Sequence, residues 1–269
     1  MDIPLGKPTD YPERYDPGLL APMARATSRA AMGIGVVLPF VGNDVWNGYE
    51  FSWLNERGMP RVAGLRLQVD AHSPCMVESK SMKLYLNGFA QARFPSADDV
   101  RETLAKDLSA AFGDRVAVTL LDPAQIESAD GVLPGESLDA IDVDVDTYAR
   151  DPVLLETNSA AGAVTETLHT HLFRSLCPVT AQPDWASLLI RYSGPPVDRA
   201  GLLRYLISYR NHAGFHEATV EQIFVDLKAR CACDRLLVAG AFLRRGGLDI
   251  NPLRADAGES LTLPRLSRQ

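Results

Sequence analysis

A thiol and a carboxylate lie close together in the segment SLCPVTAQPDW, residues 175–185. Cys177 is followed by a proline, and Asp184 comes seven residues after the cysteine, directly behind a second proline. Because proline restricts the backbone, such a loop can hold the two side chains in a fixed arrangement for a nucleophile and a proton donor. Taken alone, the residue types are more typical of a buried structural cysteine and a carboxylate that caps the next strand, so that alternative stays open at this point.

Histidine spacing raises the question of a metal site. The pattern HTH places His169 and His171 on one face of a predicted strand, as two metal ligands would be, and Cys177 would be the third. No CxxC or HExxH motif accompanies them, and Cys231 and Cys233 have the wrong spacing for a zinc knuckle. We therefore predict no metal site.

The segment FHEATVEQI begins a predicted helix with His216 and Glu217. A carboxylate accepts two N–H bonds from a guanine-type edge, and a histidine adds one more, so the pair suits a heterocyclic ligand. An acid in the first helical turn is equally explained by the helix dipole.

Two other segments have the composition of phosphate sites. ESKSMKLY, residues 78–85, places serines and lysines at a helix start, although a solvated, capped helix end is the better interpretation of that segment alone. RRGGLDINP, residues 244–252, sets adjacent arginines beside glycines, which suits a phosphate close to the backbone and equally a tight hairpin. No GxGxxG motif opens a helix after a strand, so a Rossmann cofactor site is not predicted.

Hydrophobic periodicity predicts the same order of elements in both halves of the chain. In the first half we predict strands over 45–55, 61–73, 115–122 and 141–146, and helices over 78–89 and 96–113, the second capped by Ser96 and stopped by Gly113. In the second half we predict strands over 163–175, 185–194 and 235–247, and helices over 197–214 and 216–230. Residues 1–43 show little periodicity and are predicted to be an irregular lead-in.

This β-β-α-α-β order in each half predicts an α+β protein with two domains, 1–152 and 153–269, each an antiparallel sheet with two helices on one face. Open edges of such small sheets pair with a second copy, so we expect a homodimer.

Composition bounds the class of protein. The 269 residues carry a net charge of −7, with 46% apolar and 23% charged residues, which is typical of a soluble globular chain and excludes disorder. No apolar run approaches the ~20 residues that span a bilayer, and the acidic balance argues against a nucleic-acid binder. The N-terminal residues do not form a secretory signal and four cysteines are too few for a disulfide scaffold, so we expect a cytoplasmic protein with free thiols.

Taken together, the segments resemble the bimodular form of the NADPH-dependent 7-cyano-7-deazaguanine reductases, the nitrile reductases of queuosine biosynthesis. The resemblance is carried, in the family's order, by DYPERYDPGLL, YEFSWLNERGMP, ESKSMKLYLN, SLCPVTAQPDWASL, NHAGFHE and RRGGLDINP, and it covers nearly the whole chain. It implies two tandem tunnelling-fold (T-fold) domains, with the ESKS motif in the first, the cysteine in the second and a site at the interface of two T-fold units.

The resemblance also implies roles for individual residues. Cys177 matches the nucleophile that attacks the nitrile carbon to form a thioimide, and Asp184 matches the donor that protonates the nitrile nitrogen. Hydride from NADPH then gives an imine, and a second NADPH gives the aminomethyl product. The matches to substrate-binding positions are Val77, Glu78, Ser79, Phe215, His216 and Glu217. The matches to NADPH-binding positions are Ser79, Lys80, Arg245 and Gly246.

Two alternative functions remain. A zinc-dependent cyclohydrolase of the same fold, acting on a pterin or guanine nucleotide, would share the base-binding carboxylate but needs a His/Cys metal triad that the sequence does not display. A catalytically silent T-fold binding protein would not need the Cys177 and Asp184 pair. Metal analysis of the purified protein separates the cyclohydrolase from the reductase.

Overall fold

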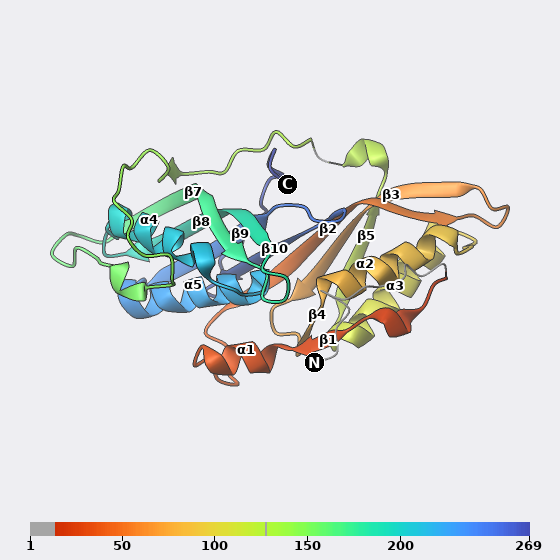
Figure 1. Ribbon diagram of the computed structural model, residues 1–269, viewed down its shortest axis with the longest axis horizontal. Coiled ribbons are helices and arrows are strands. Elements are labelled where there is room, and N and C mark those ends of the chain that lie inside the picture. Colours follow the sequence, from red (N-terminus) through yellow and green to blue (C-terminus); the bar gives the residue numbers. More distant parts are fainter. Residues whose placement is uncertain (1–13, 127) are drawn as a thin grey trace. The chain divides into compact units, whose positions relative to one another are not determined.

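The computed structural model describes residues 14–126 and 128–269, which form an α+β structure (Figure 1). They divide into two compact units. The first comprises the described residues of Met1–Gly35, Asn43–Glu127 and Arg244–Ile250, and the second comprises Val36–Gly42, Ser128–Leu243 and Asn251–Gln269. Residues 128–152 thus pack with the second unit, and the expected domain division after residue 152 stays a prediction.

The first unit contains a three-stranded antiparallel sheet in the order β5-β3-β2. Its strands are β2 (Val41–Leu54), β3 (Pro60–Asp70) and β5 (Val116–Leu121). Two helices, α2 (Ser79–Asn87) and α3 (Ala97–Phe112), lie along one face of this sheet (Figure 1). A second, two-stranded sheet pairs β1 (Pro22–Ala24) with β4 (Cys75–Val77), and α1 (Arg25–Ala31) follows β1.

Local signals in the sequence account for α3. The Ser96 hydroxyl accepts a hydrogen bond from the Asp99 backbone N–H, and Gly113 ends the helix in the left-handed conformation, with φ 73°. The side chains on its inner face are packed against those of the sheet and of α2. The buried core of the unit includes Trp46, Leu65, Leu67, Met82, Val100, Leu104 and Phe112.

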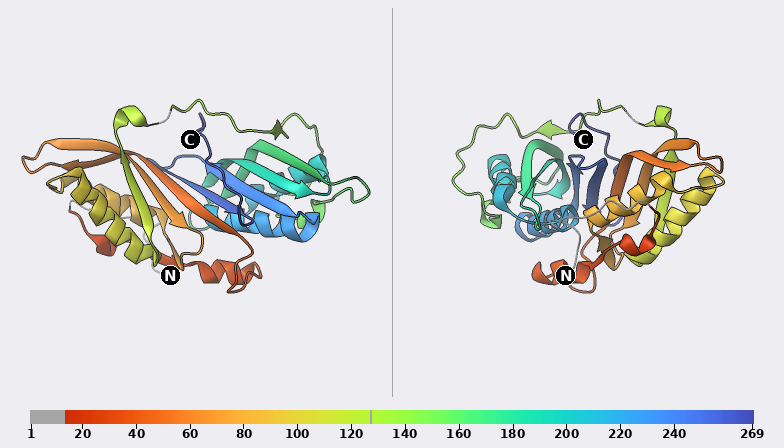
Figure 2. Two further views of the ribbon diagram at one scale, coloured as in Figure 1. Left: turned by 180° about the vertical axis from the view of Figure 1, so that it is seen from behind. Right: turned by 45° about the vertical axis from the view of Figure 1, so that its right-hand side comes forward.

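The second unit contains the strands β6 (Glu136–Ser137), β7 (Val164–Leu176), β8 (Pro183–Gly194) and β9 (Arg235–Phe242), and the end of β10 (Leu248–Ala255). They lie in the order β6-β7-β8-β9-β10 and are antiparallel except for β6 and β7, which are parallel. Helices α4 (Arg199–Ser208) and α5 (His216–Cys231) lie along the sheet (Figure 2). The expectation of a purely antiparallel sheet is therefore wrong at β6, which the sequence analysis did not predict.

The two halves of the fold repeat one another. Apart from β4, which lies between β3 and α2, the elements β2-β3-α2-α3-β5 and β7-β8-α4-α5-β9 have the same order along the chain and their strands the same order in the sheet. In each half the seventh residue of the first helix donates to the eleventh residue of the second. Tyr85 hydroxyl to Asp107 Oδ2 is 2.8 Å, and Tyr205 hydroxyl to Asp226 Oδ2 is 2.6 Å.

The backbone repeats as well as the side chains. Both hairpins carry an irregularity in their register, between Gly48 and Phe51 in β2 and between Thr170 and Phe173 in β7. The last residue of each first strand forms an isolated parallel bridge with the segment before the second helix. These bridges join Leu54 to Arg93 and Leu176 to Ala213.

Three other expectations were wrong for physical reasons. Within the described part of residues 1–43, β1 and α1 are regular elements, and α1 lacked apolar periodicity because its buried side chains are arginines. Arg25 Nη2 lies 2.6 Å from the Asp44 carboxylate, and Arg29 Nη2 donates to the Ala71 carbonyl over 2.6 Å. The prediction for residues 1–13 lies outside the described residues.

The predicted strand over 141–146 is an extended segment with no ladder partner among the described residues. Its side chains do alternate between half-buried and exposed, which is what the pattern detected. The strand predicted over 235–247 ends at Phe242, because Gly246 and Gly247, with φ 60° and 85°, turn the chain into β10. No helix in the described part of the chain is long and apolar enough to cross a membrane.

Replacement of Tyr205 by phenylalanine is expected to lower the free energy of unfolding by about 1–3 kcal/mol, because the buried Asp226 carboxylate loses a hydrogen-bond donor. Urea unfolding followed by circular dichroism measures this difference. Tyr148→Phe is the matched control, since that side chain is 43% exposed, and it should change stability by less than about 0.5 kcal/mol. Equal stability of the two variants would contradict the structural role of the Tyr205–Asp226 bond.

Candidate active site

The β7–β8 hairpin positions Cys177 and Asp184. Ser175 pairs with Asp184 in the ladder, and residues opposite each other in an antiparallel pair point to the same face. Cys177 follows Ser175 by two positions, so it continues the same face just beyond the end of β7. The two side chains are 6% and 2% exposed, respectively.

The loop between them is closed by its own backbone. The Cys177 N–H donates to the Gln182 carbonyl over 2.9 Å, and the Ala181 N–H donates back to the Cys177 carbonyl over 3.0 Å. Ala181 adopts the left-handed conformation, with φ 55°, to complete this turn. The segment is therefore a closed turn, and the thiol is on its first residue.

Leu176 brings the start of α5 to this loop. Its N–H donates to the His212 carbonyl over 2.8 Å, and its carbonyl accepts the Gly214 N–H over 3.0 Å. A Cβ atom on Gly214 would lie 2.9 Å from Thr219 Oγ1 and 3.0 Å from His212 Nε2, so a larger residue here would displace one of these side chains.

His216, the first residue of α5, contacts Asp184 directly. His216 Nε2 lies 3.4 Å from Asp184 Oδ2. The imidazole is stacked on the Phe242 ring, with 3.9 Å between the centroids and 8° between the planes. Phe242, the last residue of β9, thus holds the His216 ring in place. Phe242 could not be predicted from the sequence, because nothing in the spacing of an aromatic residue at a strand end indicates which side chain it will stack against.

Several polar atoms around this pair are buried without hydrogen bonds. Within the described residues, Ser175 Oγ, His216 Nδ1 and Thr219 Oγ1 are buried and have no partner. All three belong to the elements that carry Cys177, Asp184 and His216. Because buried polar atoms are normally paired, such a group is typical of a site that receives a polar ligand.

The remaining predicted residues of the second unit flank His216. Phe215 is the N-cap residue of α5 and makes no side-chain cap, and Glu217 lies in the first helical turn with 4% of its surface exposed. The second unit therefore brings together Cys177, Asp184, Phe215, His216 and Glu217.

In the first unit, Glu78 caps α2. Its carboxylate accepts the Lys80 N–H over 2.6 Å and the Ser81 N–H over 2.8 Å, and the side chain is fully buried. Val77 ends β4 immediately before it, and Ser79 and Lys80 form the first turn of α2. The capped helix end that was one interpretation of the sequence is thus present. Glu78 retains lone pairs for a ligand, since a carboxylate can accept about four hydrogen bonds.

The Arg244–Gly247 turn lies beside α2. A Cβ atom on Gly246 would come within 3.2 Å of Lys83 Cδ and Cε, so Lys83 packs against the glycine. Lys83 is one helical turn after Lys80, and the Arg244 guanidinium lies 4.9 Å from the Tyr49 ring centroid. The predicted Arg245 and Gly246 therefore lie in a cationic group next to Gly247, where a Cβ atom would meet nothing within 4 Å, and this suits the phosphates of a dinucleotide. Lys83 is the residue that the geometry adds to it.

His169 and His171 make structural contacts. Their rings are 5.4 Å apart, and their Nδ1 atoms lie 3.1 Å from the Pro134 carbonyl oxygen and 2.7 Å from the Ser187 hydroxyl. In the described chain no group of three or more His, Cys, Asp or Glu side chains is arranged to hold a metal ion.

Burial separates Cys231, the last residue of α5, and Cys233, just after the helix, from solvent. It raises the pKa of Cys231 to about 12 and that of Cys233 to about 11. The thiolate is the reactive form, so both thiols should remain unalkylated by iodoacetamide in the native protein at pH 8, and their reactivity should rise only as the pH approaches those values. Peptide mapping by mass spectrometry measures this, with the half-buried Cys75 as the internal comparison. Alkylation of Cys231 or Cys233 at the rate found in unfolded protein would contradict it.

Comparison with known proteins covers both units. The family model described as "Nitrile reductase, 7-cyano-7-deazaguanine-reductase N-term" matches residues 11–120, and the model described as "QueF-like protein" matches residues 183–260. A protein of Burkholderia vietnamiensis named NADPH-dependent 7-cyano-7-deazaguanine reductase is 51% identical over 263 residues, which cover 96% of this chain and 94% of the relative. Relatives of the same name from Burkholderia pseudomallei and Burkholderia thailandensis are 51% identical over 259 residues, with the same coverage. The chain belongs to the family of NADPH-dependent 7-cyano-7-deazaguanine reductases.

Proposed function

We propose that this protein reduces the nitrile of 7-cyano-7-deazaguanine to the aminomethyl group of 7-aminomethyl-7-deazaguanine, at the cost of two NADPH, in the biosynthesis of queuosine, a modified nucleoside of tRNA. The observation that carries the proposal is the placement of Cys177 and Asp184 on one face of the β7–β8 hairpin, with His216 on the Asp184 carboxylate. The name shared by the relatives supports the choice of substrate. The arrangement of the hairpin supports a nucleophile and an acid on the same face.

Cys177 acts as the nucleophile. Its thiolate adds to the nitrile carbon, a C–S bond forms, and the nitrogen takes a proton, which gives a thioimide. Asp184 is the donor of that proton, and the His216 ring 3.4 Å away orients its carboxyl group. After reduction at the thioimide carbon the C–S bond breaks, Cys177 leaves as the thiolate, and the resulting imine is reduced to the amine.

NADPH, when bound, supplies the hydride, and each of the two reductions consumes one equivalent. Ser79, Lys80, Arg245 and Gly246 are the proposed binding residues, and Lys83 joins them because it packs against Gly246. Their cationic side chains fit the phosphate groups of the cofactor, and a glycine without a side chain lets a phosphate approach the backbone.

The substrate base is proposed to bind to the start of α5 in the second unit. The Glu217 carboxylate accepts N–H bonds from the guanine-type edge, and His216 contributes its unpartnered Nδ1. In the first unit, Glu78 is the second carboxylate proposed to bind the substrate. Phe215 provides an aromatic face for the ring. Val77 and Ser79 flank Glu78 in the same segment.

We also propose that the two structural repeats are tandem T-fold domains and that two chains form a dimer. The repeated element order and the equivalent Tyr–Asp bonds support the tandem arrangement. β5 pairs only with β3 among the described residues, and such an open edge favours pairing with a second copy. Analytical ultracentrifugation should give twice the 29.3 kDa mass of one chain, and a single-chain mass at micromolar concentration would contradict the dimer.

The proposed reaction has a defined stoichiometry. Purified protein should oxidise two NADPH for each 7-cyano-7-deazaguanine consumed, measured by NADPH absorbance and chromatography of the aminomethyl product, because nitrile-to-amine reduction takes four electrons. A ratio of one, with an accumulating imine or aldehyde, would contradict it. Stoichiometric, tightly bound zinc in the same preparation would instead favour the cyclohydrolase.

Variants of the hairpin separate the two catalytic roles. Cys177→Ala should abolish turnover, and Asp184→Asn should lower kcat by about 100-fold or more, because a positioned proton donor contributes about 10²–10⁴-fold. Cys75→Ala is the matched control and should retain activity, since Cys75 lies in β4 of the first unit outside the proposed site. Full activity of Cys177→Ala would overturn the proposed mechanism.

A further inference from the structure

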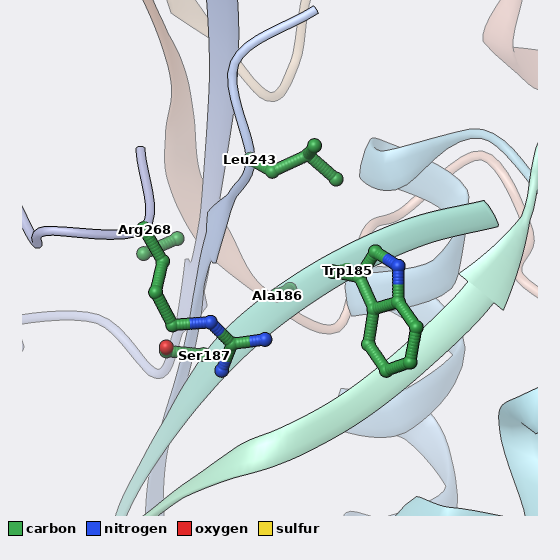
Figure 3. A pocket seen from close by; sticks show the side chains of 6 residues that line it. Trp185, Ala186, Ser187, Leu243 and Arg268 are labelled. Carbon is green, nitrogen blue, oxygen red and sulfur yellow. The ribbon is translucent and has the colours of Figure 1, made fainter.

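The second unit has two adjoining hollows that the proposed reaction does not use. One, of about 450 Å³, is lined by Trp185, Ala186, Ser187, Ala241, Leu243 and Arg268 (Figure 3). The other, of about 640 Å³, shares Trp185 and Arg268 with the first and adds Tyr148, Leu172, Ile207 and Arg210 among its lining residues. Both volumes are in the range of small-molecule sites. We refer to them together as the Trp185 hollow.

The Trp185 hollow lies on the face of β8 opposite Asp184. Successive side chains of a strand point to opposite faces, so Trp185 and Ser187 project away from the face that carries Asp184. Further along this second face, Leu189 is buried beneath Leu133 and Leu266. Leu133 and Leu266 thus shield Leu189 from solvent. Trp185 remains partly exposed, and Arg268 lines the same hollow (Figure 3).

Arginines gather around the indole. The guanidinium carbons of Arg174 and Arg210 lie 5.6 Å and 5.4 Å from the Trp185 ring centroid. Arg174 donates to the Arg210 carbonyl over 2.9 Å, and Arg268 donates to the His171 carbonyl. These contacts with a ring and with carbonyl oxygens orient the arginines without neutralising them.

No acidic side chain among the described lining residues neutralises the positive charge of the arginines in the hollow. No aspartate or glutamate is among the described residues that line it. Asp139, whose carboxylate accepts hydrogen bonds from the Thr170 hydroxyl and the His171 N–H, is not one of those lining residues. Burial lowers the pKa of His171, so the positive charge at neutral pH belongs to the guanidinium groups.

We propose that the Trp185 hollow is a second ligand site, which takes a small aromatic anion: a planar ring that carries a phosphate or carboxylate. The anion pairs with Arg268 and Arg210, whose planar donors match two oxygens at once. The ring packs against Trp185, Tyr148 and Leu172, of which the last two are both 43% exposed. Because β8 carries Asp184 on its other face, an occupant of the hollow lies directly behind the strand that holds the proposed proton donor.

Fluorescence gives a direct test, with phenyl phosphate as the probe. The chain has three tryptophans, and Trp46 and Trp53 are only 1% and 6% exposed, so saturable quenching reports on Trp185. Phenyl phosphate should quench the wild-type protein and Cys177→Ala alike. Inorganic phosphate and phenol, which each lack one half of the probe, should bind at least about tenfold more weakly.

Variants locate the bound probe. Arg268→Gln should weaken the binding of phenyl phosphate by about tenfold or more, because the charge-assisted hydrogen bond to the phosphate is lost. Arg235→Gln is the matched control, since it removes the same charge from a side chain that is 52% exposed and does not line the hollow, and it should leave the affinity unchanged. Trp185→Phe should remove the quenching but retain binding in calorimetry.

Three results would overturn the proposal. The first is no saturable quenching of the wild-type protein, which would also be the result if a second copy of the chain closed the hollow. The second is equal affinity of Arg268→Gln and Arg235→Gln. The third is binding of inorganic phosphate as tight as that of phenyl phosphate, which would exclude a role for the ring.

Discussion

The proposed catalytic group depends on the peptide unit of Leu176. This residue pairs with Pro183 in the β7–β8 ladder, and it also bonds to His212 and Gly214. Those bonds bring three chain segments to one point, so the thiol after Leu176, the carboxylate after Pro183 and the start of α5 adjoin. Because these bonds are between backbone groups, the side chains of the neighbouring residues are not needed to hold the segments together and can take part in catalysis.

The same backbone arrangement occurs in the first unit with different side chains. Leu54 donates to the Ala92 carbonyl and accepts from Phe94, both over 2.9 Å, as Leu176 does with His212 and Gly214. The residue after Leu54 is Asn55, whose side chain accepts the Arg57 and Met59 N–H groups and so closes its own turn. The same backbone bridge therefore occurs in both units, and only in the second unit is it followed by a cysteine. Function follows the residues at the site rather than the fold.

Much of this organisation could be predicted from the sequence. The helices with local signals, such as α3 between Ser96 and Gly113, were predicted closely, and the segment around Cys177 forms a closed turn next to its prolines. The segments that escaped prediction are held by distant partners. α1 depends on the buried Arg25–Asp44 ion pair, and the Phe242–His216 stack joins residues 26 positions apart. The spacing of apolar residues indicates which positions are buried. A buried arginine does not contribute to that spacing, and the spacing does not identify the strand with which a segment pairs.

The central claim is that Cys177 forms a covalent bond with the nitrile carbon, and intact-protein mass spectrometry tests it most directly. The protein is mixed with 7-cyano-7-deazaguanine in the absence of NADPH, so that the reaction stops at the thioimide. We predict a mass increase equal to that of the whole nitrile compound, mapped to the peptide that contains Cys177, and no increase for Cys177→Ala. An adduct that persists in Cys177→Ala, or an unchanged mass of the wild-type protein at saturating nitrile, would contradict the account.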